Sequence, residues 1–316
     1  MPPKKAAAAK KKPSGPKKAI NKAAKKKPPT KKKTAAKKPG AKKAAGSALE
    51  AIWAAGSLGN GGPASKWTLE SPNYQAAVKA GKKPLHLAYF AIRALGELQK
   101  LCLEYSKVPY KCDVVLSGPV FSGIKESLPF GRLPVIYDFD GKGGVLTQSD
   151  AVVRYVAKQC GMAGADEREA AVIDMLYMEW KDHKQDFAAL GEGGDLKTVP
   201  DWNKVPNGHD LTKFQAAVSG LRIFEKVLKK SKTGWLSGGK RASYADLALW
   251  MTLFEAAEED NCGEKWAATL KLPALKKFKA KVESSKALMA YLKSDRLMPR
   301  MGAGYVYKAG KFSEPR

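Results

Sequence analysis

The chain of 316 residues has a formal net charge of +27; residues 1–46 hold 18 lysines and no Asp, Glu, Arg or His, so the other 270 residues carry only +9 (27 less 18). Its four cysteines form no C-x-x-C pair and have no histidine at metal-ligand spacing, which argues against a disulfide framework, a metal site and dithiol redox chemistry, and favours a reducing compartment. The absence of an apolar run of about 20 residues predicts no transmembrane segment, and no secretory signal is recognisable.

Residues 1–46 consist mostly of Lys, Ala and Pro and are predicted to be a disordered basic tail, because they cannot bury enough apolar surface to offset their ordering entropy. The tail resembles that of a linker histone in composition. It predicts sequence-independent binding to a polyanion such as nucleic acid, an acidic cytoskeletal surface or an anionic membrane, through release of counterions; a solubilising role is the alternative. The run KKKPPTKKK is a weak nuclear-address signal.

The next residues, 47–83, are predicted to be a linker or N-terminal extension with a short helix at Ala48–Ala55. The globular part is predicted to begin near Pro84. Its expected elements are a strand at Leu85–Phe90, a helix at Ile92–Tyr105, a strand at Tyr110–Leu116, an irregular segment at Ser117–Phe130, a strand from Pro134, a connection at Gly141–Gly144, a second strand, and a helix ending at Gln159.

Everything after Gly164 is predicted to be helical until a C-terminal tail of residues 301–316. Tyr244–Glu259 is apolar on nearly all sides and is expected to be a buried central helix. The other expected helices are Asp166–Leu190, Leu211–Lys229, Pro273–Ser284 and Lys286–Lys293, with a Gly/Pro-rich loop at Gly191–Pro206.

The segment that ends at Gln159 carries the strongest indication of a small-molecule site. Proline at position 134 suits the start of a strand, and the Leu133–Pro134 bond is a candidate cis peptide. Ser149 and Asp150 stand where a helix start needs side-chain acceptors, and such a start also binds anions. The segment therefore predicts a backbone edge at Leu133 and an anion pocket at Gln148 and Ser149 for the same ligand.

These residues resemble the glutathione-binding half of a cytosolic glutathione S-transferase, closest to the sigma-like classes. The family's P-F-G-x-x-P turn, acidic-Gly hairpin and Gln-Ser helix start correspond to Pro129–Pro134, Asp140-Gly141 and Gln148-Ser149. Leu85–Phe90 resembles the first strand with its Tyr-Phe pair, and Gly238–Trp250 resembles the capping-box helix of the family's helical domain. The resemblance, from about Pro84 to Asp295, implies an α/β plus all-α fold: a thioredoxin-like domain over 84–163 and an all-helical domain over 164–300.

The resemblance also assigns roles to individual residues. Tyr89 would be catalytic, because a phenol O–H that donates to the glutathione sulfur favours the reactive thiolate; an ordinary strand-end tyrosine is the alternative. Gln148 and Ser149 would bind the γ-glutamyl carboxylate, or merely cap a helix. The cysteinyl part would pair with the main chain at Leu133 and Pro134. The residues that would meet the glycyl carboxylate, or else face solvent, are Lys125 and Arg132.

The implied protein is a cytoplasmic homodimer, with the nucleus as a second location. It would be a transferase that joins glutathione, its co-substrate, to a hydrophobic electrophile, or carries out related isomerase or peroxidase chemistry; no metal is expected. Two positions depart from the family: Leu95 replaces a second arginine, and Phe121 replaces a tryptophan. They favour a different class of function, a non-catalytic dimerisation and docking module whose tail anchors it to nucleic acid or an acidic filament.

Overall fold

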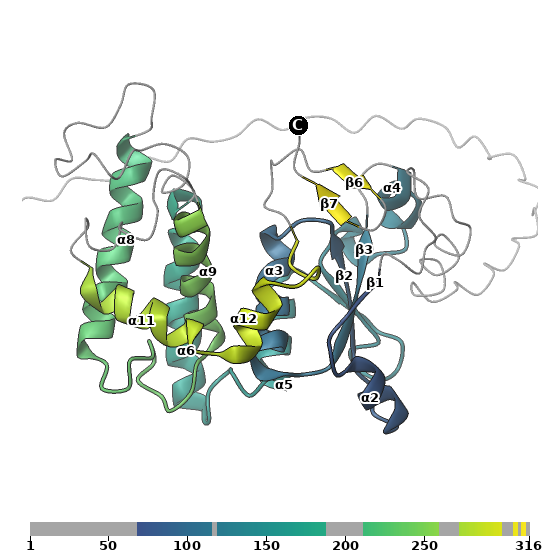
Figure 1. The fold of residues 1–316 in the computed structure, drawn as a ribbon, viewed down its shortest axis with the longest axis horizontal. Helices are drawn as coiled ribbons and strands as arrows, with labels where there is room; N and C mark the ends of the chain where they lie inside the picture. The colour runs from purple at the N-terminus through teal and green to yellow at the C-terminus, as the bar shows by residue number, and fades with distance from the viewer. Residues whose placement is uncertain are drawn as a thin grey trace, which may run out of the picture. The chain divides into compact units, whose positions relative to one another are not determined.

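The computed structural model describes residues 68–115, 119–187, 211–258, 272–298, 306–308 and 311–313 (Figure 1). The predicted basic tail, the helix at Ala48–Ala55 and the loop at Gly191–Pro206 lie outside these residues. The described elements are β1 (Thr68–Glu70), α2 (Tyr74–Lys79), β2 (Leu85–Phe90), α3 (Ala94–Ser106), β3 (Tyr110–Val115), α4 (Pro119–Lys125), the 3-10 turn η2 (Pro129–Gly131), β4 (Val135–Tyr137), β5 (Val145–Thr147), α5 (Ser149–Gln159), α6 (Glu167–Asp182), α8 (Leu211–Lys230), α9 (Tyr244–Glu258), α11 (Pro273–Glu283), α12 (Lys286–Leu292), β6 (Val306–Lys308) and β7 (Lys311–Ser313).

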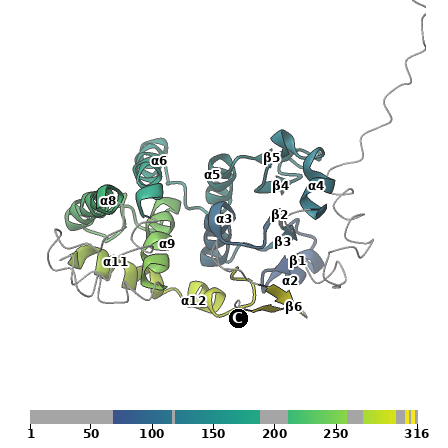
Figure 2. The same cartoon turned by 90° about the horizontal axis from the view of Figure 1, so that it is seen from above.

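Five strands form one mixed sheet in the order β1-β3-β2-β4-β5. β2 and β3 are parallel and are joined by α3, whereas β4 is antiparallel to both β2 and β5. β2 is therefore the central strand, and α3 and α5 cover one face of the sheet while α4 lies on the other (Figure 2). This arrangement confirms the predicted thioredoxin-like fold.

Two elements precede Pro84, where the sequence analysis placed the start of the globular part. β1 pairs antiparallel with β3 through Thr68 and Asp113, and Ser71 exchanges hydrogen bonds of 3.0 Å with the backbone of Tyr110. The predicted linker is therefore structured from Thr68 onward. A three-residue strand is too short to show the alternation that reveals a strand in sequence.

The segment predicted to be irregular contains the helix α4. Phe121 of this helix packs edge-to-face on Phe90 with ring centroids 5.0 Å apart, and Ile124 is fully buried. Because the apolar face is only one turn long, periodicity did not distinguish it from a loop. The helix covers the face of the sheet at the carboxyl end of β2.

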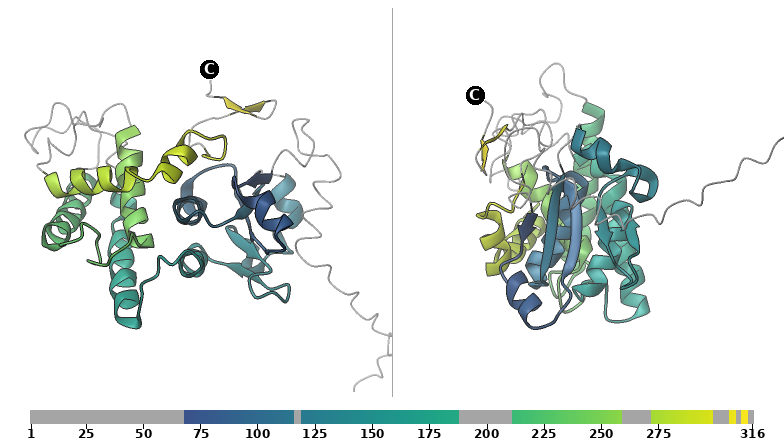
Figure 3. Two further views of the ribbon diagram at one scale, coloured as in Figure 1. Left: turned by 60° about the horizontal axis from the view of Figure 1, so that its bottom comes forward. Right: turned by 90° about the vertical axis from the view of Figure 1, so that its right-hand side faces the viewer.

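The remaining helices form an all-helical part, as predicted. α6 packs on α9, α8 packs on α11, and α9 also contacts α3; Figures 1 and 2 show these helices on the far side of α3 and α5 from the sheet. α9 is buried along most of its length, with Leu247, Trp250 and Leu253 fully enclosed. α12 leaves this group and lies beside α3 (Figure 3).

One helix prediction needs correction near its end, and the predicted C-terminal tail contains two strands. The long helix expected to reach Leu190 ends at Asp182, with His183 as its C-cap, and the chain becomes helical again at residues 184–187. Its amphipathic pattern continues through the break, so period alone concealed it. The predicted C-terminal tail contains β6 and β7, which pair antiparallel across two intervening residues, the spacing of a tight hairpin.

α9 begins with the predicted capping box. The Asp246 carboxylate accepts from Ser243 N at 2.7 Å, Ser243 Oγ at 2.6 Å and Leu236 N at 2.8 Å, and Asp246 N donates back to Ser243 Oγ at 3.3 Å. Asp246 is fully buried, and burial raises the pKa of its carboxyl group although these hydrogen bonds act in the opposite direction. The box joins the start of α9 to the segment before it.

Candidate functional site

Tyr89 lies near the carboxyl end of β2, with its ring against the start of α3. Its hydroxyl oxygen accepts a hydrogen bond from Leu95 N at 3.0 Å, and the side chain is only 5% exposed. Burial raises the pKa of the phenol above its usual value, partly offset by the N–H groups of Leu95 and Gly96. The hydroxyl therefore keeps its proton at neutral pH and remains a donor.

The start of α5 differs from the predicted cap. Gln148 is the N-cap residue at φ 73° and makes no side-chain hydrogen bond to the helix. The predicted cap by Ser149 and Asp150 is wrong: the Asp150 carboxylate accepts instead from Tyr177 Oη at 2.7 Å and from Lys181 Nζ. Because none of the described side chains caps this helix start, its N–H groups stay available to an anion.

A positive φ at a glutamine is rare and costs free energy, since the side chain meets its own backbone there. Residues held in such a conformation cluster at ligand-binding sites, so Gln148 stands out on geometry as well as on sequence. The strained backbone at Gln148 leads the chain from β5 into the first turn of α5, which lacks a side-chain cap from Gln148.

The loop before β4 lies beside this helix start. The Leu133–Pro134 peptide is cis, as the sequence suggested. Thr147 Oγ1 lies 3.0 Å from Pro134 O and 3.3 Å from Arg132 O, which ties the loop to the residue before Gln148. Leu133 itself makes no backbone hydrogen bond to any described residue, so its N–H and C=O are free to pair with an extended ligand.

A pocket of about 420 Å³ brings three of the predicted residues together: Lys125, Arg132 and Leu133 line it with Phe90, Phe121, Phe130 and Gly131. The stem of Lys125 packs against Gly131, where an added Cβ would lie 3.1 Å from Lys125 Cγ. The lining of the pocket therefore combines aromatic and cationic side chains. Tyr89, Pro134, Gln148 and Ser149 do not line it.

α3 links the remaining predicted residues. Gln99 donates from Nε2 to Ser149 O at 3.1 Å, one helical turn, about 6 Å, beyond the Leu95 N–H that holds Tyr89. Gln99 is 1% exposed, and it was not predicted because helical periodicity marks only apolar residues as buried. The signal available in the sequence was a glutamine placed between the apolar positions Leu98 and Leu101 of this helix. Leu95, in contrast, is 47% exposed although it is an apolar residue of the same helix.

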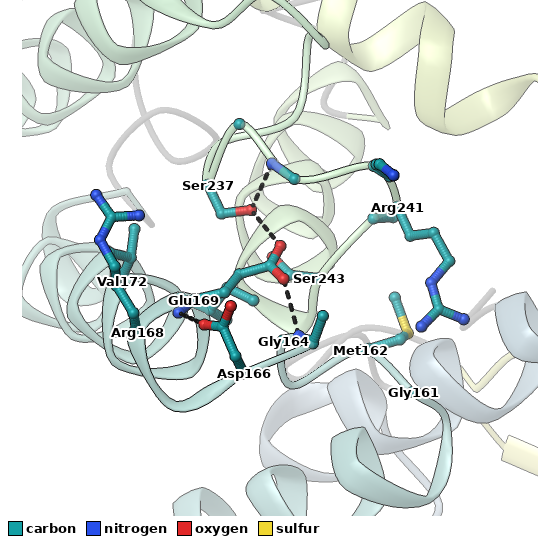
Figure 4. Close-up of a pocket in the computed structure, with 16 residues that line it drawn as sticks. Gly161, Met162, Gly164, Asp166, Arg168, Glu169, Val172, Ser237, Arg241 and Ser243 are labelled. Carbon is teal, nitrogen blue, oxygen red and sulfur yellow. Dashed lines mark hydrogen bonds between the residues drawn. The ribbon is translucent and has the colours of Figure 1, made fainter.

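A separate pocket of about 520 Å³ lies where the α5–α6 connection meets the loop before α9 (Figure 4). Its acidic groups serve local structure: Asp166 accepts from Glu169 N at 2.7 Å, and Glu169 accepts from Ala165 N at 2.8 Å. None of the predicted site residues lines this pocket. Among the described residues, no group of three or more His, Cys, Asp or Glu side chains is placed to hold a metal ion, and no helix there is both long and apolar enough to cross a membrane.

Comparison with known proteins places the chain beside one family. Residues 210–295 match the model "Glutathione S-transferase, C-terminal domain". Glutathione S-transferase 1 of Ascaris suum is 33% identical over 169 residues, which cover 52% of this chain and 75% of that protein. Human glutathione S-transferase Mu 2 is 26% identical over 226 residues, covering 69% and 94%.

Solved structures agree with these sequence relatives. A monomeric glutathione S-transferase of Necator americanus, Na-GST-3, has a TM-score of 0.52 at 28% identity and covers 67% of this chain and 97% of its own. The glutathione S-transferase of Ascaris lumbricoides has a TM-score of 0.51 at 26% identity, covering 66% and 96%. In both cases the similarity spans nearly the whole of the other protein and leaves about a third of this chain unmatched.

Proposed function

Because this chain belongs to the glutathione S-transferase family, we propose that it is a glutathione transferase that activates the glutathione thiolate for attack on a hydrophobic electrophile. The observation that carries the proposal is the free backbone of Leu133 beside the uncapped helix start at Gln148. An extended peptide pairs with a free backbone edge, and a carboxylate binds at a helix start. Glutathione offers both groups.

In the proposed binding mode, each end of glutathione meets a different part of the site. Gln148, Ser149 and the first N–H groups of α5 hold the γ-glutamyl carboxylate, with the positive end of the helix dipole adding to the attraction. The main chain at Leu133 and Pro134 pairs with the cysteinyl residue. Lys125 and Arg132, which both line the 420 Å³ pocket, take the glycyl carboxylate.

Tyr89 is the proposed catalytic residue. The Leu95 N–H donates to its oxygen, which makes the hydroxyl a better donor to the sulfur. A hydrogen bond to the charged form lowers the pKa of the thiol, and the resulting thiolate attacks the electrophile to form a thioether. The same thiolate serves isomerase or peroxidase chemistry. Assignment to the sigma-like classes rests on the Pro-Phe-Gly, Leu-Pro and Gln-Ser elements and is part of this proposal.

Calorimetry and thiol titration on the full chain test the site. Glutathione is expected to bind, Gln148→Ala to abolish binding, and Tyr89→Phe to leave binding intact while raising the pKa of the bound thiol by about one to two units, because a hydrogen bond to an anion is lost. Lys79→Ala, a substitution on α2 away from the site, serves as the control. No heat at millimolar glutathione would refute the proposal.

A second candidate function follows from the charge of residues 1–46 and from exposed apolar side chains. Met175 and Met178, three residues apart on α6, are solvent-exposed, as is Phe130, and apolar side chains that gather into an exposed patch mark a protein–protein surface. We propose that the chain forms a homodimer through them, and that its tail attaches this dimer to a polyanion such as nucleic acid, in the cytoplasm or, through KKKPPTKKK, in the nucleus.

Sedimentation of the full chain with and without duplex DNA tests this second function. A dimer is expected alone, and a DNA complex that weakens steeply as salt is raised, since each lysine–phosphate contact releases a counterion. A variant with the lysines of residues 1–46 changed to glutamine is expected to remain dimeric and to lose DNA. A chain that sediments as a monomer and does not bind DNA at low salt would contradict both the proposed dimer and the proposed binding to a polyanion.

A further inference from the structure

The first turn of α3 holds Tyr89 in two ways. The Leu95 N–H binds the hydroxyl oxygen at 3.0 Å, and Gly96 lies directly against the ring, so close that a Cβ there would overlap three ring carbons. The position of the hydroxyl therefore depends on where this turn of helix stands. Whatever fixes the turn also fixes the donor proposed to meet the glutathione sulfur.

The turn is fixed in its place through Glu97. This side chain is almost completely buried, and its carboxylate forms an ion pair of 2.7 Å with Lys100. The other oxygen, Oε1, accepts from Tyr291 Oη at 2.6 Å. Tyr291 lies on α12, nearly two hundred residues further along the chain, and is itself fully buried.

A second link joins the same two parts of the chain further along α3. Arg296, just after α12, places Nε 2.8 Å and Nη2 3.3 Å from the two oxygens of Glu104, which also accepts from Tyr110 Oη at 2.8 Å. Glu104 stands two helical turns, about 10 Å, beyond Glu97. The two links are similar in chemistry, but only the one at Glu97 lies next to the residues that touch Tyr89.

We propose that Tyr291 is a positioning residue for Tyr89: its hydroxyl holds the Glu97 carboxylate and thereby the first turn of α3, whose backbone holds the Tyr89 hydroxyl. The proposal rests on the proposed role of Tyr89 in activating glutathione. It makes the end of the all-helical part a determinant of thiol reactivity, although Tyr291 does not touch the ligand.

Electrostatic effects determine which group donates in the hydrogen bond between Tyr291 and Glu97. Burial and the adjacent Glu97 carboxylate raise the pKa of Tyr291 well above its usual value, so it stays protonated and donates. The Glu97 charge also acts to raise the pKa of Tyr89, after the larger effect of burial. The groups that interact electrostatically with Glu97 include Lys100, Tyr89, Cys112 and Tyr291, and Tyr291 in turn interacts with Glu104, Tyr110 and Arg296. Arg93 stands at the N-cap of the same helix. Removing the Tyr291 hydroxyl leaves the Glu97 charge less compensated, and any anion near Tyr89 is then disfavoured.

The test is the pKa of the bound glutathione thiol, followed by the ultraviolet absorbance of the thiolate in the full-length protein. Tyr291→Phe is expected to raise this pKa by about half a unit or more and to lower kcat at neutral pH several-fold, with the KM for glutathione unchanged. Glu97→Gln is expected to shift the pKa in the opposite direction, because the opposing charge is gone, and it remains informative should Tyr291→Phe not fold.

Arg296→Lys is the matched control, because it breaks the two-pronged link to Glu104, keeps the positive charge beside the Tyr291 ring and leaves the hydrogen bond to Glu97. It is expected to lower stability without changing the thiol pKa. In a Tyr89→Phe background, Tyr291→Phe is expected to raise the thiol pKa by less than it does in the parent protein, because only the Glu97 charge, and no longer the position of the Tyr89 hydroxyl, can then act on the thiolate. Equal pKa rises in Tyr291→Phe and Arg296→Lys would overturn the proposal, as would an unchanged pKa in both Tyr291→Phe and Glu97→Gln. If Tyr89→Phe alone has no effect, the proposed catalytic role fails instead.

Discussion

Replacing Asp246 with alanine is expected to lower the free energy of unfolding by about 3 to 5 kcal/mol. The carboxylate satisfies the backbone N–H groups of Leu236 and Ser243 and the Ser243 hydroxyl, all in a fully buried setting. Alanine leaves these donors without an acceptor and opens space at the start of the most buried helix. Urea denaturation of the full-length protein, followed by far-ultraviolet circular dichroism, measures the change.

Ser243→Ala provides the comparison. It removes only the hydroxyl cap and leaves the two backbone N–H groups on Asp246, so a loss of about 1 kcal/mol is expected. The difference between the two variants isolates the cost of the orphaned backbone donors. A loss below 1 kcal/mol in Asp246→Ala would show that water or rearrangement replaces the carboxylate.

Gly96→Ala is expected to destabilise the protein by about 1 to 3 kcal/mol and to impair thiol activation as strongly as Tyr89→Phe. Glycine-to-alanine changes inside helices usually stabilise by about 0.5 to 1 kcal/mol. Here the sign reverses, because the added methyl overlaps three carbons of the Tyr89 ring, the farthest at 2.8 Å. The ring must move, and its hydroxyl leaves the Leu95 N–H.

Thermal unfolding and titration of the bound thiol measure the two effects in the same samples. Leu95→Ala is the matched control, since that side chain is largely exposed and its backbone N–H is retained; it is expected to change stability by less than 0.5 kcal/mol. A Gly96→Ala protein that is more stable than the parent would mean that Tyr89 has room to shift without cost.

The sequence was most informative where residue type and position act together over many residues. The helices α8, α9, α11 and α12 were predicted to within about one residue, because periodic apolar positions and caps such as Ser243 and Asp246 are local signals. The fold followed from two separated motifs in order. The capping box shows why such signals work: both partners lie within three residues.

The sequence failed where a contact joins distant residues or where an element is very short. β1 and α4 have too few residues for a period. The cap expected from Asp150 is absent because Tyr177 and Lys181, on another helix, engage its carboxylate. Gln99 and the Glu97–Tyr291 pair are invisible for the same reason, since a polar residue on an apolar face has meaning only once its partner is known. The roles proposed for Tyr89, Lys125 and Gln148 remain predictions.

β1 affects how readily the edge of the sheet can pair with a second molecule. Without it, β3 would be the outer strand, and its unpaired N–H and C=O groups would offer a template on which a second molecule can add a strand. Three residues, Thr68–Glu70, take over that edge, and so short an edge strand offers much less template than the six residues of β3. A shortened chain that begins at Pro84 would keep every residue proposed to contact glutathione, but it would expose the edge of β3. The expected result of this truncation is therefore self-association and not the loss of glutathione binding.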